Sequence, residues 1–197
     1  HVQVDRTEEI YDAVVSAVGM LSDPKIPDWP GAEDFAGQLF HSAQWPDDAD
    51  LVGKRVAVVG TGSTACQIVP SIAPIAGHLT LYQRQPSWVI PKAENHYSDG
   101  RRAELRRTVP RLRLRFREFW RREKRSFIGR LDVPDSKADR AARATARGYI
   151  DRVFRDRPDL RAMVTPDYPY LGKRPVQSSE FYPALLRDDV ELVPRAV

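Results

Sequence analysis

A glycine-rich turn between an apolar run and a helix-forming run places the strongest constraint on the fold. Residues 54–59 read KRVAVV, residues 60–65 read GTGSTA, and a further apolar segment follows directly. The order of strand, G-x-G-x-x-A turn and helix is typical of a dinucleotide-binding domain. The sequence therefore predicts an α/β fold, with a Rossmann-like domain built on a parallel sheet.

The turn has the residue types that a pyrophosphate site requires. Gly60 permits the tight turn, Gly62 lets the backbone approach the pyrophosphate, and the small Ala65 lets the helix pack close to the strand. The start of the helix then offers free N–H groups and the positive end of its dipole. Glycine turns are common, so the position of this turn between two predicted strands carries the prediction. The predicted cofactor-binding residues of the turn are Gly60, Thr61, Gly62, Ser63, Thr64 and Ala65.

The residue at the end of the next predicted strand indicates which nucleotide binds. An NAD enzyme is expected to place Asp or Glu there, on the ribose hydroxyls, whereas this chain has Arg84. A guanidinium suits a 2′-phosphate, so we expect NADPH. The alternative is that Arg84 is one more solvated arginine in an arginine-rich chain.

Apolar runs predict the other strands of the domain. Short, β-branched runs at residues 11–18, 54–59 and 79–84 are typical of strands that are buried on both faces, as in a parallel sheet with helical crossovers. Residues 21–50 contain four prolines and predict an ordered connector.

A helical insertion is predicted over about residues 101–157. Its second helix spans about residues 138–154, ends before Arg157-Pro158, and follows a turn at residues 132–137. Ala142, Ala146, Tyr149 and Val153 share one face of this second helix, so we expect both helices to be structural cover.

Basic residues concentrate in the first part of this insertion. Residues 101–130 hold thirteen Lys and Arg against three Glu, whereas the whole chain has a net charge of +4. We expect a packed amphipathic helix with an Arg-rich solvated face, rather than a nucleic-acid or anionic-membrane site. Pro110 is expected near the start of the helix or at a kink. The apolar stripe that recurs at spacings of three and four consists of Leu105, Val109, Leu112, Phe116, Phe119 and Trp120.

Cysteine content and hydropathy exclude several classes of protein. With Cys66 as its only cysteine, the chain cannot form an internal disulfide or a thiolate metal cluster, and we expect no metal site. Cys66 itself is expected to be a small buried thiol rather than a nucleophile. No run approaches the roughly 18 to 20 apolar residues of a membrane span, and the N-terminal residues have no signal-peptide pattern, so we expect a cytoplasmic protein.

Upstream of the glycine turn, residues 35–46 match the pattern F-x-G-x-x-x-H-x-x-x-W-P. This pattern resembles the fingerprint of type I Baeyer–Villiger monooxygenases. Related flavin-containing monooxygenases share its first part but usually have Tyr or Phe where this chain has Trp45-Pro46. The fixed residues of the fingerprint are Phe35, Gly37, His41 and Trp45.

Further segments extend the resemblance through nearly the whole chain. Residues 17–19, 83–86 and 168–175 are similar to the family's A-T-G, Q-R-T-P and Y-P-x-G-x-K-R-P segments. Three departures are present. Val18 and Gln85 stand where the family has Thr, and Gly172 lies one position later than the family's glycine.

The resemblance implies an enzyme that uses NADPH and FAD to insert one oxygen atom of O2 into a ketone, giving an ester or lactone. By resemblance, Arg174 is the catalytic cation that stabilises the anion formed when oxygen reacts with the reduced flavin. Lys173 is implied to help Arg84 hold the 2′-phosphate, and Gln85 occupies a position of the same phosphate site. His41 and Trp45 are implied to couple the nicotinamide position to domain motion rather than to transfer protons.

The resemblance also implies a domain layout. Residues 1–34 are expected to be a remnant of an FAD-binding domain, 35–50 the fingerprint linker, 51–175 the NADPH-binding domain, and 176–197 the return to the FAD-binding domain. Gly60 and Gly62 form the only G-x-G pair, so the phosphate turn for FAD is absent from this chain. We therefore expect an internal fragment that by itself binds NADPH weakly or not at all and is inactive.

Two other functions remain open at this stage. One is a flavin-containing monooxygenase that oxidises nitrogen or sulfur, which Trp45-Pro46 disfavours. The other is a non-catalytic Rossmann-type binding module whose Arg-rich helix contacts an acidic partner or nucleic acid. The substrate and the oligomeric state are not indicated by the sequence.

Overall fold

The computed structural model describes residues 2–4, 7–17, 19, 23–92, 97–124 and 130–194. The chain divides into two compact units, residues 1–49 and residues 50–197. The boundary lies one residue before the predicted start of the nucleotide-binding domain. Each unit is described by itself.

A three-stranded parallel sheet organises the second unit. Its strands are β3 (Arg55–Val59), β4 (His78–Gln83) and β7 (Val190–Pro194), in the order β3-β4-β7. Both pairings are parallel, and Tyr82 on the central strand is the partner of Val59 on one side and of Val193 on the other. The strands predicted at residues 54–59 and 79–84 are confirmed, as is the α/β class.

The helix α1 (Ala65–Ile72) connects β3 to β4, and it contains a proline. Pro70 has no N–H group, so the carbonyl of Cys66, four residues earlier, has no helical donor. The buried hydroxyl of Ser178 lies 3.4 Å from this carbonyl oxygen and donates to it. The same hydroxyl accepts from the N–H of Phe181, the first residue of α6 (Phe181–Ala184). The Ser178 hydroxyl therefore supplies the missing donor to a carbonyl of α1 and an acceptor for the first N–H of α6.

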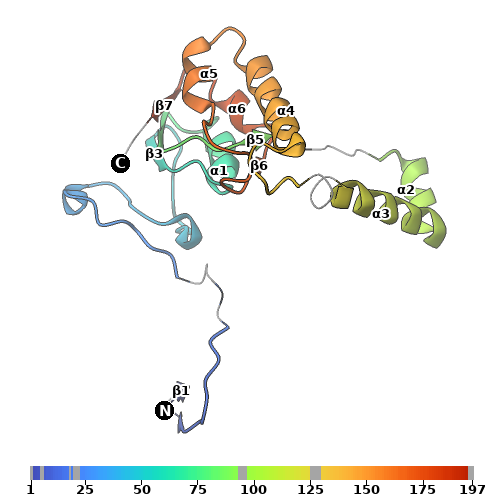
Figure 1. The fold of residues 1–197 in the computed structure, drawn as a ribbon. Coiled ribbons are helices and arrows are strands. Elements are labelled where there is room, and N and C mark those ends of the chain that lie inside the picture. The colour runs from blue at the N-terminus through green and yellow to red at the C-terminus, as the bar shows by residue number, and fades with distance from the viewer. Residues whose placement is uncertain are drawn as a thin grey trace. The chain divides into compact units, whose positions relative to one another are not determined.

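Helices α4 (Lys137–Val153), α5 (Pro158–Val164) and α6 pack together in the second unit, as Figure 1 shows in orange and red. A short parallel pair, β5 (Val89–Ile90) with β6 (Val176–Gln177), lies against α4. The predicted helix at 138–154 is confirmed, with Ala142, Ala146 and Tyr149 buried. Pro158 does not end α4, because α4 stops at Val153 and Pro158 is the first residue of α5. The turn predicted at residues 132–137 is present before α4.

The second unit continues past residue 175. We expected residues 176–197 to return to an FAD-binding domain, but β6, α6 and β7 all belong to the second compact unit. β7 pairs along the whole length of its strand with β4. The described residues show no boundary at position 176, because β7 pairs with β4 and is the third strand of the same parallel sheet.

The Arg-rich segment forms two helices rather than one, α2 (Asp99–Arg106) and α3 (Thr108–Glu123). Pro110 explains the break at Arg107, because a proline in a continuous helix would clash with the carbonyl of residue 106. Pro110 therefore lies in the first turn of α3, as predicted. The expected packing of the apolar stripe is wrong for the described residues, since Phe116 is 67% exposed and Trp120 is 42% exposed. An apolar stripe is buried only where a second surface faces it, and among the described elements α3 mainly contacts α2.

The first unit contains a short antiparallel pair, β1 (Val2–Val4) with β2 (Thr7–Glu9), and two 3₁₀ turns, η1 (Ala32–Asp34) and η2 (Ser42–Gln44). The strand predicted at residues 11–18 is wrong for residues 11–17, which form no strand, and Val15 is 89% exposed. Val18 lies outside the described residues. A run of apolar residues becomes a strand only where neighbouring strands accept its hydrogen bonds. In the described residues of this unit, only β1 and β2 are strands.

Gly77 allows two backbone segments to approach each other at the start of the parallel sheet. A Cβ atom at Gly77 would lie 2.5 Å from the carbonyl oxygen of Gly53, a backbone atom that cannot move aside. Gly148 in α4 is exposed and has open space around a Cβ atom. We expect Gly77→Ala to lower the free energy of unfolding by about 1–3 kcal/mol through overpacking.

The matched control is Gly148→Ala, which we expect to raise the free energy of unfolding by about 0.5–1 kcal/mol because alanine favours helix. Chemical denaturation of both variants measures the two changes. Equal stability of Gly77→Ala and the unmodified protein would contradict the close approach.

Candidate functional site

The glycine turn lies at the carboxyl end of β3 and continues the register of the sheet. The N–H of Gly60 donates to the carbonyl oxygen of Tyr82 on β4, at 2.9 Å. Gly60 has φ of +107°, a conformation that side chains disfavour. A Cβ atom at Gly60 or at Gly62 would meet no atom within 4 Å, so the space above the turn is open.

The start of α1 presents its donors to this open space. The N–H groups of Ser63, Thr64 and Ala65 have no hydrogen-bond acceptor among the described residues. The Thr64 side chain does not cap the helix, and Ser63 and Thr64 are both exposed. Ala65 is buried where the helix meets the sheet. These donors and the helix dipole favour an anion at this point.

A buried threonine ties the turn to the end of β4. The hydroxyl of Thr61 is 3.1 Å from the carbonyl oxygen of Gln85 and donates to it, and Thr61 is only 7% exposed. Arg84 follows β4 directly and is exposed. The predicted turn and the predicted phosphate-binding arginine therefore lie at the same edge of the sheet.

The segment that contains Lys173 and Arg174 is attached to the same edge. The indole N–H of Trp88 donates to the carbonyl oxygen of Tyr168 at 3.1 Å. The Tyr168 hydroxyl in turn donates to the carbonyl oxygen of Pro86 at 2.8 Å. The ammonium group of Lys173 lies 5.3 Å from the centre of the Tyr168 ring, a cation–π distance. Pro86 is two residues after Arg84, so contacts connect the end of β4 to Lys173.

The three predicted cations are exposed. Among the described residues, Arg84, Lys173 and Arg174 form no ion pair. Each cation is therefore available to an anionic ligand. The structure brings Arg84 to the edge that contains the turn and links Lys173 to the segment after β4 through Tyr168, whereas the contacts of the described residues include none that joins Arg174 to Arg84 or to the turn.

Cys66 stands in the first turn of α1, but its chemistry is not that of a nucleophile. Its side chain is 1% exposed, and burial raises the pKa of the thiol to about 12. The thiol is therefore neutral at physiological pH, and the expectation that Cys66 is buried is confirmed.

The fingerprint residues lie in the first unit. The ring of Phe35 lies so close to Gly37 that a Cβ atom there would be 2.6 Å from it. The imidazole Nδ1 of His41 accepts from the N–H of Ala43 at 3.1 Å and so caps η2. Trp45 packs edge-to-face on Phe40, with ring centres 5.1 Å apart. His41 thus has a local structural contact in this unit.

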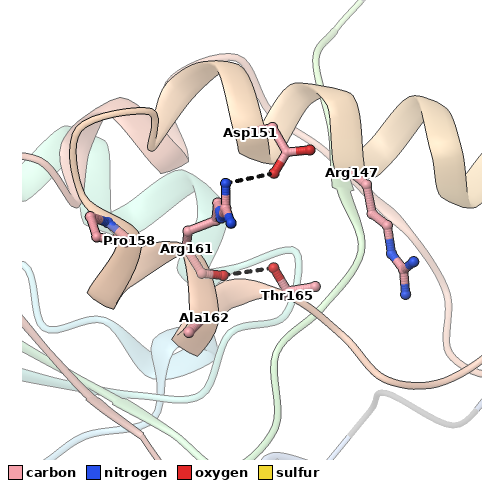
Figure 2. Close-up of a pocket in the computed structure, with 6 residues that line it drawn as sticks. All are labelled: Arg147, Asp151, Pro158, Arg161, Ala162 and Thr165. Atoms are coloured by element: carbon pink, nitrogen blue, oxygen red, sulfur yellow. Dashed lines mark hydrogen bonds and ion pairs between the residues drawn. The ribbon is translucent and has the colours of Figure 1, made fainter.

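A pocket of about 370 Å³ lies between α4 and α5 and contains none of the predicted site residues. Figure 2 shows its ion pair, in which Arg161 is 3.6 Å from Asp151, and the Thr165 hydroxyl donating to the Arg161 carbonyl oxygen. This pair neutralises part of the pocket, and no nucleophile accompanies it. The pocket is therefore not the candidate site. It is lined by Arg147, Asp151, Pro158, Arg161, Ala162 and Thr165.

Sequence reasoning missed Asp139, which is fully buried and accepts a hydrogen bond from the N–H of Tyr170. The pattern Ser136-x-x-Asp139 is a readable helix-start signal, and Ser136 does cap α4 by accepting from the N–H of Asp139. The contact with Tyr170 joins residues 31 positions apart, and no local pattern reports it.

Among the described residues, no group of three or more His, Cys, Asp or Glu side chains is arranged to hold a metal ion. None of the described helices has both the length and the apolar character that a membrane crossing requires.

Comparison with known proteins gives consistent matches. The profile of the family described as FMO-like, flavin-binding monooxygenase-like, matches residues 2–102. A Baeyer–Villiger monooxygenase of Streptomyces coelicolor is 42% identical over 182 residues, which are 92% of this chain and 34% of that protein. This chain thus spans about one third of the length of that relative.

Solved structures agree with the sequence matches. An oxidized steroid monooxygenase bound to NADP superposes with a TM-score of 0.71 at 31% identity, covering 90% of this chain and 40% of that one. OTEMO in complex with FAD and NADP superposes with a TM-score of 0.69 at 26% identity, covering 91% of this chain and 41% of that one.

The raised pKa of Cys66 predicts an unreactive thiol. At pH 8 the group is far below its pKa of about 12, so we expect a negligible thiolate fraction and no reaction of the folded protein with an aromatic disulfide reagent. In guanidinium chloride, one thiol per chain should react within minutes. Rapid labelling of the folded protein would show that Cys66 is accessible.

Proposed function

The chain belongs to the flavin-binding monooxygenase-like family, and from this premise we propose that it is the NADPH-binding part of a Baeyer–Villiger monooxygenase. The whole protein would use NADPH, FAD and O2 to convert a ketone to an ester or lactone. The observation that carries the proposal is the open glycine turn at the start of α1, which is hydrogen-bonded through Thr61 to the segment that follows the exposed Arg84. The relatives named Baeyer–Villiger monooxygenase and the neighbours bound to NADP and FAD support it.

In this proposal, the turn holds the pyrophosphate of NADPH. The N–H groups of Ser63, Thr64 and Ala65 donate to it, and the open space at Gly60 and Gly62 admits the backbone approach that a pyrophosphate needs. NADPH supplies the reducing electrons when it is bound. The fit is good, because every group that would face the pyrophosphate is a donor.

Arg84 and Lys173 would bind the 2′-phosphate together. The planar guanidinium of Arg84 can form two parallel hydrogen bonds to phosphate, and the Lys173 ammonium adds a point charge. Gln85 stands where the resembled family has Thr, so its amide replaces a hydroxyl donor. The Thr61 hydroxyl keeps the backbone of Gln85 next to the turn.

Arg174 is proposed as the catalytic cation. A guanidinium stays charged at any working pH and donates in a plane, so it can stabilise an anion that forms during oxygen transfer. The described residues contain no acidic partner that would neutralise it. The chain has no second G-x-G pair, so we assign the phosphate-binding turn for FAD, but not the whole FAD-binding domain, to residues other than those of this chain.

We retain the proposed domain roles with one change. Residues 1–34 are assigned to an FAD-binding domain, 35–50 to the fingerprint linker, and 51–194 to the NADPH-binding domain. His41 and Trp45 are proposed to couple linker position to the nicotinamide. We place the reaction in the cytoplasm, since NADPH is regenerated inside cells and a single free cysteine suits a reducing compartment.

Product analysis separates this proposal from oxidation of nitrogen or sulfur. The FAD-loaded protein that contains this chain is incubated with NADPH and either a cyclic ketone or a thioether. We expect a lactone from the ketone, in keeping with Trp45-Pro46. A sulfoxide from the thioether with no lactone from any ketone tested would overturn the Baeyer–Villiger assignment.

Replacement of Arg84 tests the nucleotide assignment. Removal of a charge-assisted phosphate contact should weaken NADPH by roughly 10- to 100-fold, while NADH, which has no 2′-phosphate, should change by less than about threefold. Steady-state kinetics of Arg84→Ala with both nucleotides measure this. The control is Arg55→Ala, at the opposite end of β3 from the turn. Equal losses for NADPH and NADH would refute the role of Arg84.

Replacement of Arg174 tests the proposed catalytic cation. We expect Arg174→Ala in the FAD-loaded protein to keep flavin binding and reduction by NADPH but to lower ester formation by at least about 100-fold, because the developing anion loses its counter-charge. The electrons should then appear as hydrogen peroxide. Rapid-reaction absorbance and product yield measure the two steps. Full ester yield in Arg174→Ala would remove Arg174 from the mechanism.

A further inference from the structure

We propose that Asp139 on α4 is a positioning residue for the cofactor-binding segment at residues 168–174, acting through the backbone of Tyr170. The inference rests on the proposed function of that segment and adds a residue that no sequence motif of the site contains. It assigns the helical insertion an indirect part in nucleotide recognition.

The contacts of Asp139 are complete and specific. One carboxylate oxygen accepts from the N–H of Tyr170 at 2.8 Å, and the other accepts from the N–H of Asp135 at 2.9 Å. The guanidinium of Arg143, one helical turn further along α4, is 2.8 Å from the second oxygen. Both oxygens are therefore occupied within a site from which solvent is excluded.

The electrostatics keep Asp139 charged in spite of its burial. Burial alone raises the pKa of this carboxyl. The N–H groups of Tyr170 and Asp135, with the nearby charge of Arg143, lower the pKa by more than burial raises it, and the net result is a pKa below the ordinary value. The carboxylate is thus ionised at neutral pH, which strengthens the hydrogen bond from Tyr170.

Burial of a carboxylate costs desolvation free energy, and the hydrogen bonds and the ion pair of Asp139 must offset that cost. An apolar side chain of similar volume would avoid the desolvation cost, but it would leave the Tyr170 N–H without this acceptor. The geometry points to the Tyr170 backbone as the group that Asp139 fixes. Through Asp139, the helical insertion is hydrogen-bonded to this segment.

A short hydrogen-bonded turn connects Tyr170 to Lys173, so the position of the Tyr170 backbone affects that of Lys173. The N–H of Gly172 donates to the Pro169 carbonyl oxygen at 2.8 Å, and a Cβ atom at Gly172 would be 3.0 Å from the Tyr168 ring. Lys173 lies over that same ring. Trp88 fixes Tyr168 from the side of β5, and Asp139 fixes Tyr170 from the side of α4. Removal of the Asp139 carboxylate weakens the attachment of Tyr170 and should shift the turn that places Lys173.

The test compares variants of the FAD-loaded protein that contains this chain. Dissociation constants of NADP⁺ and NAD⁺ are measured for Asp139→Ala, Asp139→Asn and the control Asp151→Ala, an exposed carboxylate on the same helix. For Asp139→Ala we expect NADP⁺ to weaken by roughly tenfold while NAD⁺ changes less than about twofold, because Lys173 contacts only the 2′-phosphate. Asp151→Ala should match the unmodified protein.

The conservative variant separates positioning from general stability. Asn keeps an oxygen that accepts from the Tyr170 N–H but loses the charge that strengthens this bond, so Asp139→Asn should show a smaller selective loss of NADP⁺ affinity than Asp139→Ala, even if its melting temperature is lowered. If Asp139→Ala does not fold, the same comparison is made with Asp139→Asn, for which a selective loss of roughly two- to fivefold is expected.

Two outcomes contradict different claims. An unchanged ratio of NADP⁺ to NAD⁺ affinity in Asp139→Ala, or in Asp139→Asn where that variant replaces it, refutes the positioning role while leaving the proposed function intact. An unmodified protein without any preference for NADP⁺ refutes the proposed nucleotide site itself, and with it this inference.

Discussion

The hydrogen bond from the N–H of Gly60 to the carbonyl of Tyr82 fixes the geometry on which the site depends. It extends the β3–β4 pairing one residue beyond the strand and so fixes where the chain turns toward α1. The direction of α1, and with it the aim of its free N–H groups, follows from that turn. The left-handed φ of Gly60 is required because the chain must reverse while still paired to β4.

The elements predicted correctly are those whose signal is contained in a short window. β3, the turn and β4 follow from local apolar runs and glycine spacing, and α4 follows from its buried face. Trp88, Ser178 and Asp139 each make their decisive contact with residues at least 31 positions away. Those contacts depend on which elements meet in space, and the sequence within a window holds no information about that.

Two apolar segments were predicted to be buried and are exposed instead. Residues 11–17 and the stripe on α3 have the composition of buried elements, yet Val15 and Phe116 are exposed in the structure. Apolar composition reports a tendency to leave water, and burial follows only if a partner surface is in place. Composition alone therefore predicted strand and packing where the described residues provide no neighbour.

Exposed arginine is abundant in this chain, so charge alone does not identify the site. Arg187 and Arg157 are held by neighbouring aspartates, whereas the arginines of α3 are mostly solvated. Arg84 differs from both groups because it follows β4 at the edge of the sheet where the glycine turn leads into α1, and the next residue, Gln85, is hydrogen-bonded to Thr61 of that turn. Two sources of positive potential at one place bind an anion more strongly than either does alone, since the second adds attraction to a ligand that the first has already oriented. This combination, rather than any single residue, is why we propose the edge of the sheet after β3 and β4 as the nucleotide site.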